Sequence, residues 1–90
     1  MDASQALELA KGAARVRQLR FVGPHVTGRM SERQATRDDV VEAVRTASSA
    51  AVSDDGPGRW VIKGGADLDG DELSVVVRID GNCVWVVTIF

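Results

Sequence analysis

The sequence predicts a single α+β domain in which two or three N-terminal helices pack on an antiparallel meander sheet of three or four strands. Two observations indicate this class. Apolar residues recur at helical spacing in the first half of the 90-residue chain, and they alternate with polar residues in most of the second half. A chain of this length forms one domain, residues 1–90, and buries roughly two-thirds of its unfolded surface around one core.

Helix start signals divide the first half into three helices. Residues 2–19 form an Ala-rich amphipathic pattern. Pro24 suits the first turn of a second helix, residues 24–34, because its ring sets φ and its missing N–H would have been unpaired there. Thr36 and Asp39 then form a capping pair for a third helix. The expected buried side of that helix consists of Val40, Val41, Val44 and Ala47.

The second half has the pattern of strands separated by turns. Residues 47–52 lose helical periodicity and predict a weak first strand, and the Asp-, Gly- and Pro-rich residues 53–58 predict a turn. Residues 59–63, 72–80 and 83–90 show the alternation or the β-branched content that is typical of strands. A meander of consecutive antiparallel strands follows from these short connections.

The loop between the last two strands decides which side chains share a face of the sheet. A three-residue loop, Asp80-Gly81-Asn82, leaves one face wholly apolar, and binary patterning favours it. A two-residue turn instead pairs Val77 with Val84 or Val86 and moves Thr88 to the core face. The favoured register pairs Ile79 with Cys83, Val77 with Trp85, Val75 with Val87 and Leu73 with Ile89.

In the favoured register, the second face of the sheet is both apolar and basic. Four large apolar side chains would be exposed on it, a patch that monomers seldom carry. We therefore expect the first helix, a second copy of the chain or a partner protein to cover this face, and hence a homodimer or a partner complex. The expected face comprises Val76, Val84, Val86 and Phe90 with Arg59, Lys63, Ser74, Arg78 and Thr88.

The net charge of −2 conceals an uneven distribution. Residues 10–37 contain seven basic residues and one acidic residue, a balance of +6, so the remainder carries −8. This asymmetry suits local binding of an anion or phosphate backbone, although an acidic chain is a poor non-specific nucleic-acid binder. One cysteine excludes an internal disulfide. With no secretory signal and no apolar run of membrane-spanning length, we expect a cytoplasmic protein without a membrane partner.

The second predicted helix carries the residues best suited to chemistry. His25, the only histidine, and Arg29 and Arg33 are spaced four apart, which places them along one side of a helix. Val26 and Met30 lie on the adjacent side and have the character of buried contacts. One imidazole and two guanidinium groups would therefore project from the same surface.

This stretch resembles a bacterial family known as domain-of-unknown-function family 4258. The resemblance rests on the run His25-x-x-x-Arg29-Met30-x-x-Arg33, on the capped helix that follows it, and on the closing strands Leu73–Val77 and Val84–Phe90. It covers residues 21–90, and the additional N-terminal helix of residues 1–20 lies outside it.

The resemblance implies both a fold and an activity. That family is placed in the superfamily of barnase-, EndoU-, colicin- and RelE-like ribonucleases, whose fold packs helices on an antiparallel sheet. It implies a RelE-like domain and a metal-independent endoribonuclease of toxin type, with RNA as substrate and an antitoxin or other protein as partner. By position in the family pattern, the catalytic candidates are His25, Arg29 and Arg33, with Thr88 on the last strand.

Metal-independent cleavage of RNA needs a base for the ribose 2′-OH, cations for the charged phosphorane and an acid for the leaving 5′-oxygen. His25 could serve as the base or the acid, and Arg29 and Arg33 would clamp phosphate. The substrate-binding candidates on the sheet are Lys63, Arg59 and Arg78.

Two alternatives stay open. In the first, the stretch is purely structural: His25 caps its helix or packs against Trp60, and the two arginines pair with Asp38, Asp39 or Glu42. In the second, the chain is a non-enzymatic interaction module that binds protein through its sheet face.

No metal or cofactor is expected. The run Asp67-x-Asp69-Gly70-Asp71 suggests a calcium loop, but its glycine stands two positions early and the twelfth position holds Arg78 in place of glutamate. The glycine pairs elsewhere in the chain lack a following helix and therefore predict turns, not phosphate loops.

Overall fold

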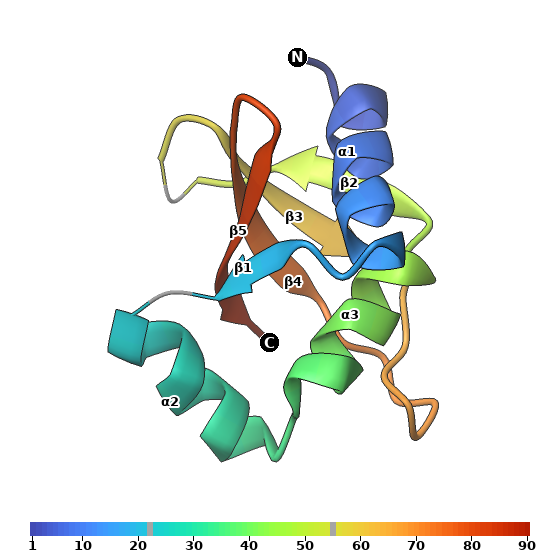
Figure 1. The fold of residues 1–90 in the computed structure, drawn as a ribbon, viewed down its shortest axis with the longest axis vertical. Coiled ribbons are helices and arrows are strands. Elements are labelled where there is room, and N and C mark those ends of the chain that lie inside the picture. The colour runs from blue at the N-terminus through green and yellow to red at the C-terminus, as the bar shows by residue number, and fades with distance from the viewer. Residues whose placement is uncertain (22, 55) are drawn as a thin grey trace.

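The computed structural model describes residues 1–21, 23–54 and 56–90, and this part of the chain forms three helices and one five-stranded sheet (Figure 1). The α+β class is therefore confirmed. The predicted turn at 53–58 separates two strands as expected, except that its Asp55 lies outside the described residues, as does Val22. No helix in the described ranges is long and apolar enough to cross a bilayer. The elements are α1 (Ala3–Arg15), β1 (Leu19–Phe21), α2 (Gly23–Arg33), α3 (Arg37–Arg45), β2 (Ser49–Val52), β3 (Arg59–Lys63), β4 (Val75–Asp80) and β5 (Cys83–Ile89).

The sheet is mixed, with strand order β1-β5-β4-β3-β2. Strands β2 to β5 form the predicted antiparallel meander, but β1 adds a fifth strand that runs parallel to β5. The expectation of a purely antiparallel sheet with three or four strands was wrong in this respect. With only three residues, β1 is too short to show a period, and its partner strand lies more than sixty residues later in the chain.

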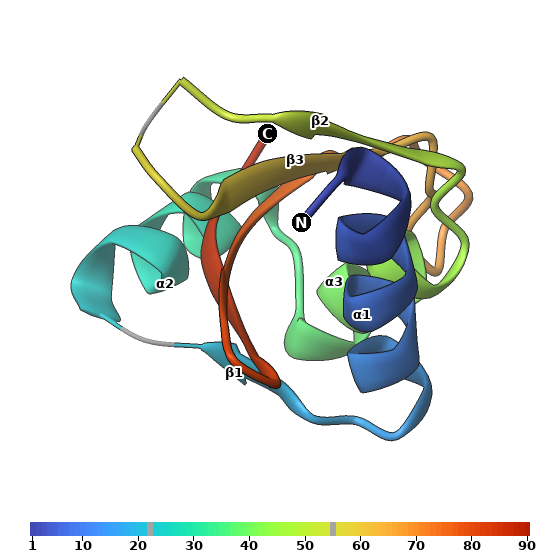
Figure 2. The same cartoon turned by 90° about the horizontal axis from the view of Figure 1, so that it is seen from above.

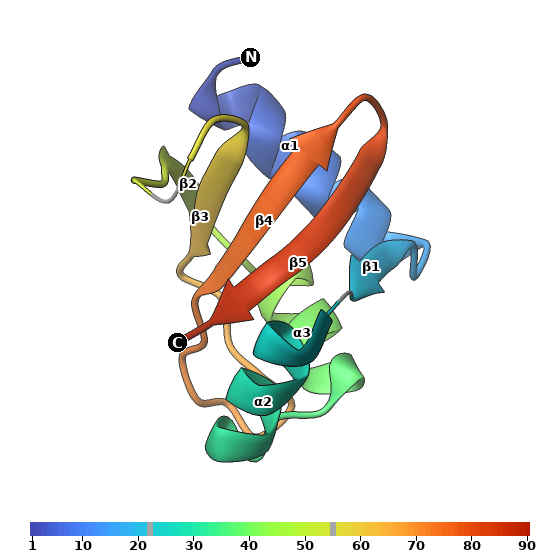
Figure 3. The same ribbon diagram turned by 90° about the vertical axis from the view of Figure 1, so that its left-hand side faces the viewer.

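The helices lie on both sides of the sheet. Figures 2 and 3 show α1 and α3 together on one side and α2 on the other, against β5. The close packing of α1 is possible because the side it turns inward consists of small residues, Ala6, Ala10 and Ala14, all of them buried. The first helix therefore covers the core face, and the expectation that it could cover the second face was wrong.

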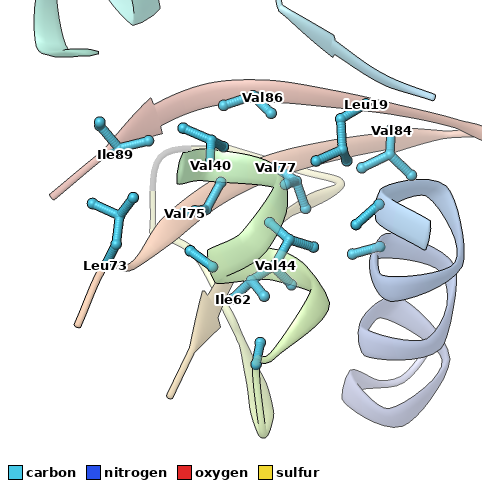
Figure 4. Packing of buried hydrophobic residues seen from close by; sticks show 14 of the residues in the cluster. Leu19, Val40, Val44, Ile62, Leu73, Val75, Val77, Val84, Val86 and Ile89 are labelled. Atoms are coloured by element: carbon cyan, nitrogen blue, oxygen red, sulfur yellow. The ribbon is translucent and has the colours of Figure 1, made fainter. Parts of the chain in front are cut away.

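The core lies between this helix pair and the inner face of the sheet. Apolar residues of β3, β4 and β5 lie on the same side of the sheet as Val40 and Val44 of α3, as Figure 4 shows. Burying β-branched side chains at about 25 cal/mol per Å² drives this packing. The strand residues in this core cluster are Leu19, Trp60, Ile62, Val75, Val77, Val84, Val86 and Ile89.

The register of β4 and β5 differs from the favoured prediction. The connection is a two-residue turn, so Asp80 pairs with Cys83 and Val77 with Val86. A β-bulge then skips Val87, which returns Thr88 to the outer face opposite Val76. The expected apolar patch on the second face was consequently wrong, because Val84 and Val86 are core residues. A homodimer or partner complex stays a prediction, but the exposed apolar patch no longer supports it.

The capping pair predicted for the third helix is confirmed. The Asp39 carboxylate accepts hydrogen bonds from the Thr36 N–H at 2.9 Å and the Thr36 hydroxyl at 3.0 Å, and it also accepts one from the Leu68 N–H at 3.1 Å. The backbone hydrogen bond from Thr36 is the main cause that lowers the pKa of Asp39 below its usual value, against the opposing effect of burial. Asp39 therefore ties the start of α3 to the acidic loop after β3.

A second tight contact joins that loop to the other end of α3. A Cβ atom on Gly65 would fall on the Ala43 carbonyl oxygen and close to the Ala47 amide nitrogen. These are backbone atoms that cannot move aside without disturbing the helix. Gly65 is therefore needed for the close approach of the loop to α3.

Replacing Gly65 by alanine is expected to lower the free energy of unfolding by about 1–3 kcal/mol or more, because the new methyl group overlaps helix backbone. The same change at Gly12 is expected to raise it by about 0.5–1 kcal/mol, because Gly12 lies in α1 with open space around its Cα. Urea unfolding of the two variants checks the pair. Equal effects of the two substitutions would contradict the close approach at Gly65.

Replacing Asp39 by asparagine is expected to lower the free energy of unfolding by about 1–2 kcal/mol at pH 7, because the amide cannot accept all three hydrogen bonds. The lowered pKa of Asp39 contributes stability above the pKa of the unfolded chain, and this contribution disappears as the pH falls through the folded pKa. The difference between wild type and variant should therefore shrink below about pH 4. Asp38→Asn is the control, since Asp38 is exposed and should show a much smaller change. A difference that stays constant down to pH 2 would disprove the role of the charge.

Candidate functional site

Four residues form a continuous row across the outer face of the sheet. Direct cross-strand pairing joins Arg20 of β1 to Trp85 of β5, Trp85 to Arg78 of β4, and Arg78 to Arg59 of β3. Paired residues on neighbouring strands project from the same face. Three guanidinium groups and one indole therefore share the face opposite to α1 and α3, and we call these four residues the arginine row.

The indole of Trp85 lies between two of these guanidinium groups. The central carbon of the Arg20 guanidinium lies 5.2 Å from the ring centroid, and that of Arg78 lies 5.6 Å from it. The two arginines come from the strands on either side of β5, so each approaches from its own side. Cation–π attraction holds both guanidinium groups beside the ring and leaves their N–H edges available for other partners.

Within residues 1–21, 23–54 and 56–90, the arginine row has no carboxylate partner. Among the described residues, the ion pairs involve Arg17, Arg29 and Arg45, and none of them reaches the row. Arg59 and Arg78 stand directly opposite each other, an arrangement that is destabilising for two like charges. An unneutralised group of cations on one surface attracts anions.

His25 reaches the same surface from α2. It lines a cleft of about 540 Å³ together with Arg59, Arg78, Trp85, Val86 and Val87. His25 stands in the first turn of α2, which contacts β5. The cleft thus brings an imidazole beside two arginines that lie more than thirty residues away in the chain.

Helix α2 is fixed to the end of β5 by apolar and polar contacts. Val26 and Met30 are buried on its inner side, as predicted. Arg29 donates a hydrogen bond from Nε to the Ile89 carbonyl oxygen at 3.3 Å, and it forms an ion pair with Glu32 of its own helix at 3.2 Å. Arg29 therefore helps to position the helix that carries His25, and it does not line the cleft.

The other predicted site residues are not among those that line the cleft. Arg33 is exposed in the last turn of α2. Lys63 is exposed at the end of β3, opposite Ser49. Thr88 is half-buried on the outer face beyond the bulge, opposite Val76. Of the seven predicted site residues, the cleft brings together His25, Arg59 and Arg78.

The structural alternative for this stretch predicted other contacts. Asp38 pairs with Arg17 at 2.9 Å and Glu42 pairs with Arg45 at 2.7 Å, so neither acid partners the arginines of α2. The strong contact with Arg45 is the main cause that lowers the pKa of Glu42. His25 is exposed on the cleft, whereas Trp60 belongs to the inner face of the sheet.

Sequence reasoning missed Trp85 and Arg20 as site residues. Trp85 alternates with Val84 and Val86, and the two-residue turn that was disfavoured is the register that places it opposite Arg78. The alternation was therefore a usable signal for Trp85. Arg20 carried no comparable signal, because its place beside Trp85 depends on the parallel pairing of β1.

The acidic loop after β3 is organised by its own backbone. One oxygen of the Asp67 carboxylate accepts hydrogen bonds from the N–H groups of Asp69 at 2.9 Å and Asp71 at 3.0 Å. This is the local turn that Asp commonly makes. Within the described ranges, no group of three or more His, Cys, Asp or Glu side chains gathers closely enough to hold a metal ion.

Replacing Arg59 by glutamine is expected to raise the free energy of unfolding by about 0.2–1 kcal/mol at low salt, because it removes one of two directly opposed like charges. The gain should vanish in high salt, which screens the repulsion. Lys63→Gln on the same strand is the matched control, since its cross-strand partner Ser49 is neutral. Denaturant unfolding at two salt concentrations checks this, and an equal gain from both variants would argue against a specific repulsion at the arginine row.

Comparison with known proteins supports one assignment. No curated protein and no solved structure matches the chain. The family model described as a domain of unknown function, DUF4258, matches residues 22–90. This range includes α2, α3, β2 to β5, every residue that lines the cleft, and three of the four residues of the arginine row. The helix α1 and Arg20 lie outside the match. Since the match covers well over half of its length, the chain belongs to the DUF4258 family.

Proposed function

We propose that this protein is a metal-independent endoribonuclease of RelE-like type, which binds RNA in the cleft beneath His25. One observation carries the proposal: the single imidazole of the chain shares a cleft of about 540 Å³ with two arginines that have no carboxylate partner among the described residues. Phosphate is a ligand whose charge and geometry suit paired guanidinium groups. An imidazole beside a bound phosphodiester is suited to proton transfer near neutral pH.

The proposed reaction is an internal transesterification. His25 removes the proton from a ribose 2′-OH, and the 2′-oxygen attacks the adjacent phosphorus. The bond from phosphorus to the 5′-oxygen breaks, and water supplies the proton that the leaving oxygen needs. The products are a 2′,3′-cyclic phosphate and a 5′-OH, and Arg59 and Arg78 stabilise the charge that gathers on the non-bridging oxygens.

The cellular setting belongs to the same proposal. An unrestrained ribonuclease of this kind acts as a toxin, and an acidic protein partner that covers the arginine row would hold it inactive. The second candidate function is a protein-interaction module that uses this face without catalysis. The specific observation in its favour is that tryptophan and arginine, which form the row, are the residues most enriched at binding hot spots. RNA cleavage by the purified chain separates the two functions.

Replacing His25 by alanine is expected to lower the rate of RNA cleavage at least about 100-fold, the usual effect of losing a general base. The fold should be retained because His25 is exposed. Ser31→Ala, exposed on the same helix, is the matched control and should cleave normally. The measurement follows a labelled RNA in the presence of a chelator and identifies the 2′,3′-cyclic phosphate end.

The same two variants test the proposal in cells. Expression of the wild type and of Ser31→Ala should arrest growth, whereas His25→Ala should not. Normal growth at high wild-type expression would refute the toxin assignment, and cleavage retained by a folded His25→Ala protein would refute the mechanism.

A further inference from the structure

We propose that Arg20 forms a second phosphate-binding subsite at the β1 edge of the sheet, so that the ligand is a single strand of nucleic acid that crosses the sheet from Arg59 to Arg20. The inference rests on the proposed function for its ligand class, RNA. It extends that proposal by giving the strand a path beyond the cleft. Arg20 itself lies outside the cleft lining and outside the family match, so the N-terminal segment adds this subsite.

The length of the arginine row suits a chain of phosphates better than a single anion. The row occupies β1, β5, β4 and β3, which are four neighbouring strands. Three strand spacings of about 4.8 Å separate its ends by roughly 14 Å. One phosphate can bridge Arg59 and Arg78, which stand directly opposite each other, but it cannot also reach Arg20. A ligand that engages all three arginines must therefore carry more than one phosphate.

The position of Trp85 indicates which part of this ligand the arginine row contacts. Guanidinium groups lie 5.2 Å and 5.6 Å from the indole centroid, so both arginines compete with nucleobases for the ring. A base could stack on Trp85 only by displacing one of them. Trp85 is therefore a positioning residue that holds Arg20 and Arg78 apart, and the contacts it supports are to the phosphate backbone, which carries no sequence information.

Arg20 is held on a fixed element. Its neighbours Leu19 and Phe21 pair with Val84 and Val86 of β5, and Leu19 is buried in the core. The subsite is thus placed by the sheet itself, as a binding site that must hold a defined geometry requires. The exposed side chain is nevertheless open to solvent and to a ligand.

The test measures binding of thymidine oligonucleotides two and ten nucleotides long, which lack the 2′-OH and cannot be cleaved by the proposed reaction. Arg20→Gln should weaken binding of the decanucleotide about 3- to 10-fold and leave the dinucleotide unchanged. It should also reduce the slope of log affinity against log salt by about 0.7, the value for one phosphate contact on a single strand. The matched control is Arg15→Gln, an equal change of charge at an exposed position on α1.

The role of Trp85 is tested in the same assay. Trp85→Leu should weaken binding of the decanucleotide about as much as Arg20→Gln does. Trp85→Phe should bind it as the wild type does, because it keeps an aromatic ring between the arginines. The subsite is overturned if Arg20→Gln behaves like Arg15→Gln, if it weakens both lengths equally, or if neither oligonucleotide binds the wild type. Length-dependent binding without RNA cleavage would overturn the proposed catalysis and leave the subsite standing.

Discussion

The β-bulge at Val87 is the constraint on which the arrangement of the outer face depends. β5 must supply core side chains at Val84, Val86 and Ile89, a spacing that strict alternation cannot satisfy. The extra residue resolves this conflict, because it shifts the alternation by one position without interrupting the strand. Trp85 and Thr88 then both face outward. Without the bulge, either Ile89 would leave the core or Trp85 would leave the arginine row.

The bulge also contributes to the cleft that His25 lines. Val87, the skipped residue, lines the cleft, and the strand ends at the Ile89 carbonyl that accepts the hydrogen bond from Arg29. The end of β5 therefore sets the position of α2, and α2 sets the position of His25. The site combines one helix end with three strands, so its geometry depends on tertiary packing far more than on any local motif. The directly opposed Arg59 and Arg78 destabilise the sheet beside this cleft. Such a loss of stability is common where the requirements of binding and of stability compete.

Most of the fold could be predicted from the sequence, because the signals were local. The capping pair of Thr36 and Asp39 marked the start of α3, and alternation marked β3 and β4. The features that were predicted wrongly depend on contacts between residues far apart in the chain. A three-residue strand has no measurable period, and a bulge is invisible to binary patterning because an apolar strand such as β5 satisfies several registers equally well. The predicted register placed Trp85 on the wrong face of the sheet, and for this reason the arginine row was not predicted.

The charge pattern shows why the site could be predicted only in part. The basic stretch of residues 10–37 is largely occupied by structural contacts: Arg17 pairs with Asp38, Lys11 donates a hydrogen bond to the Ala47 carbonyl at 2.6 Å, and Arg37 stacks on Phe21 at 5.3 Å. Only Arg20 from that stretch joins the arginine row. The other members come from the acidic remainder of the chain, where Arg59 and Arg78 are isolated cations in sequence but neighbours in the sheet. A count of charge along the chain therefore located the basic residues correctly but did not identify the arginine row, because the pairing of strands that brings Arg59 and Arg78 together is not visible in such a count.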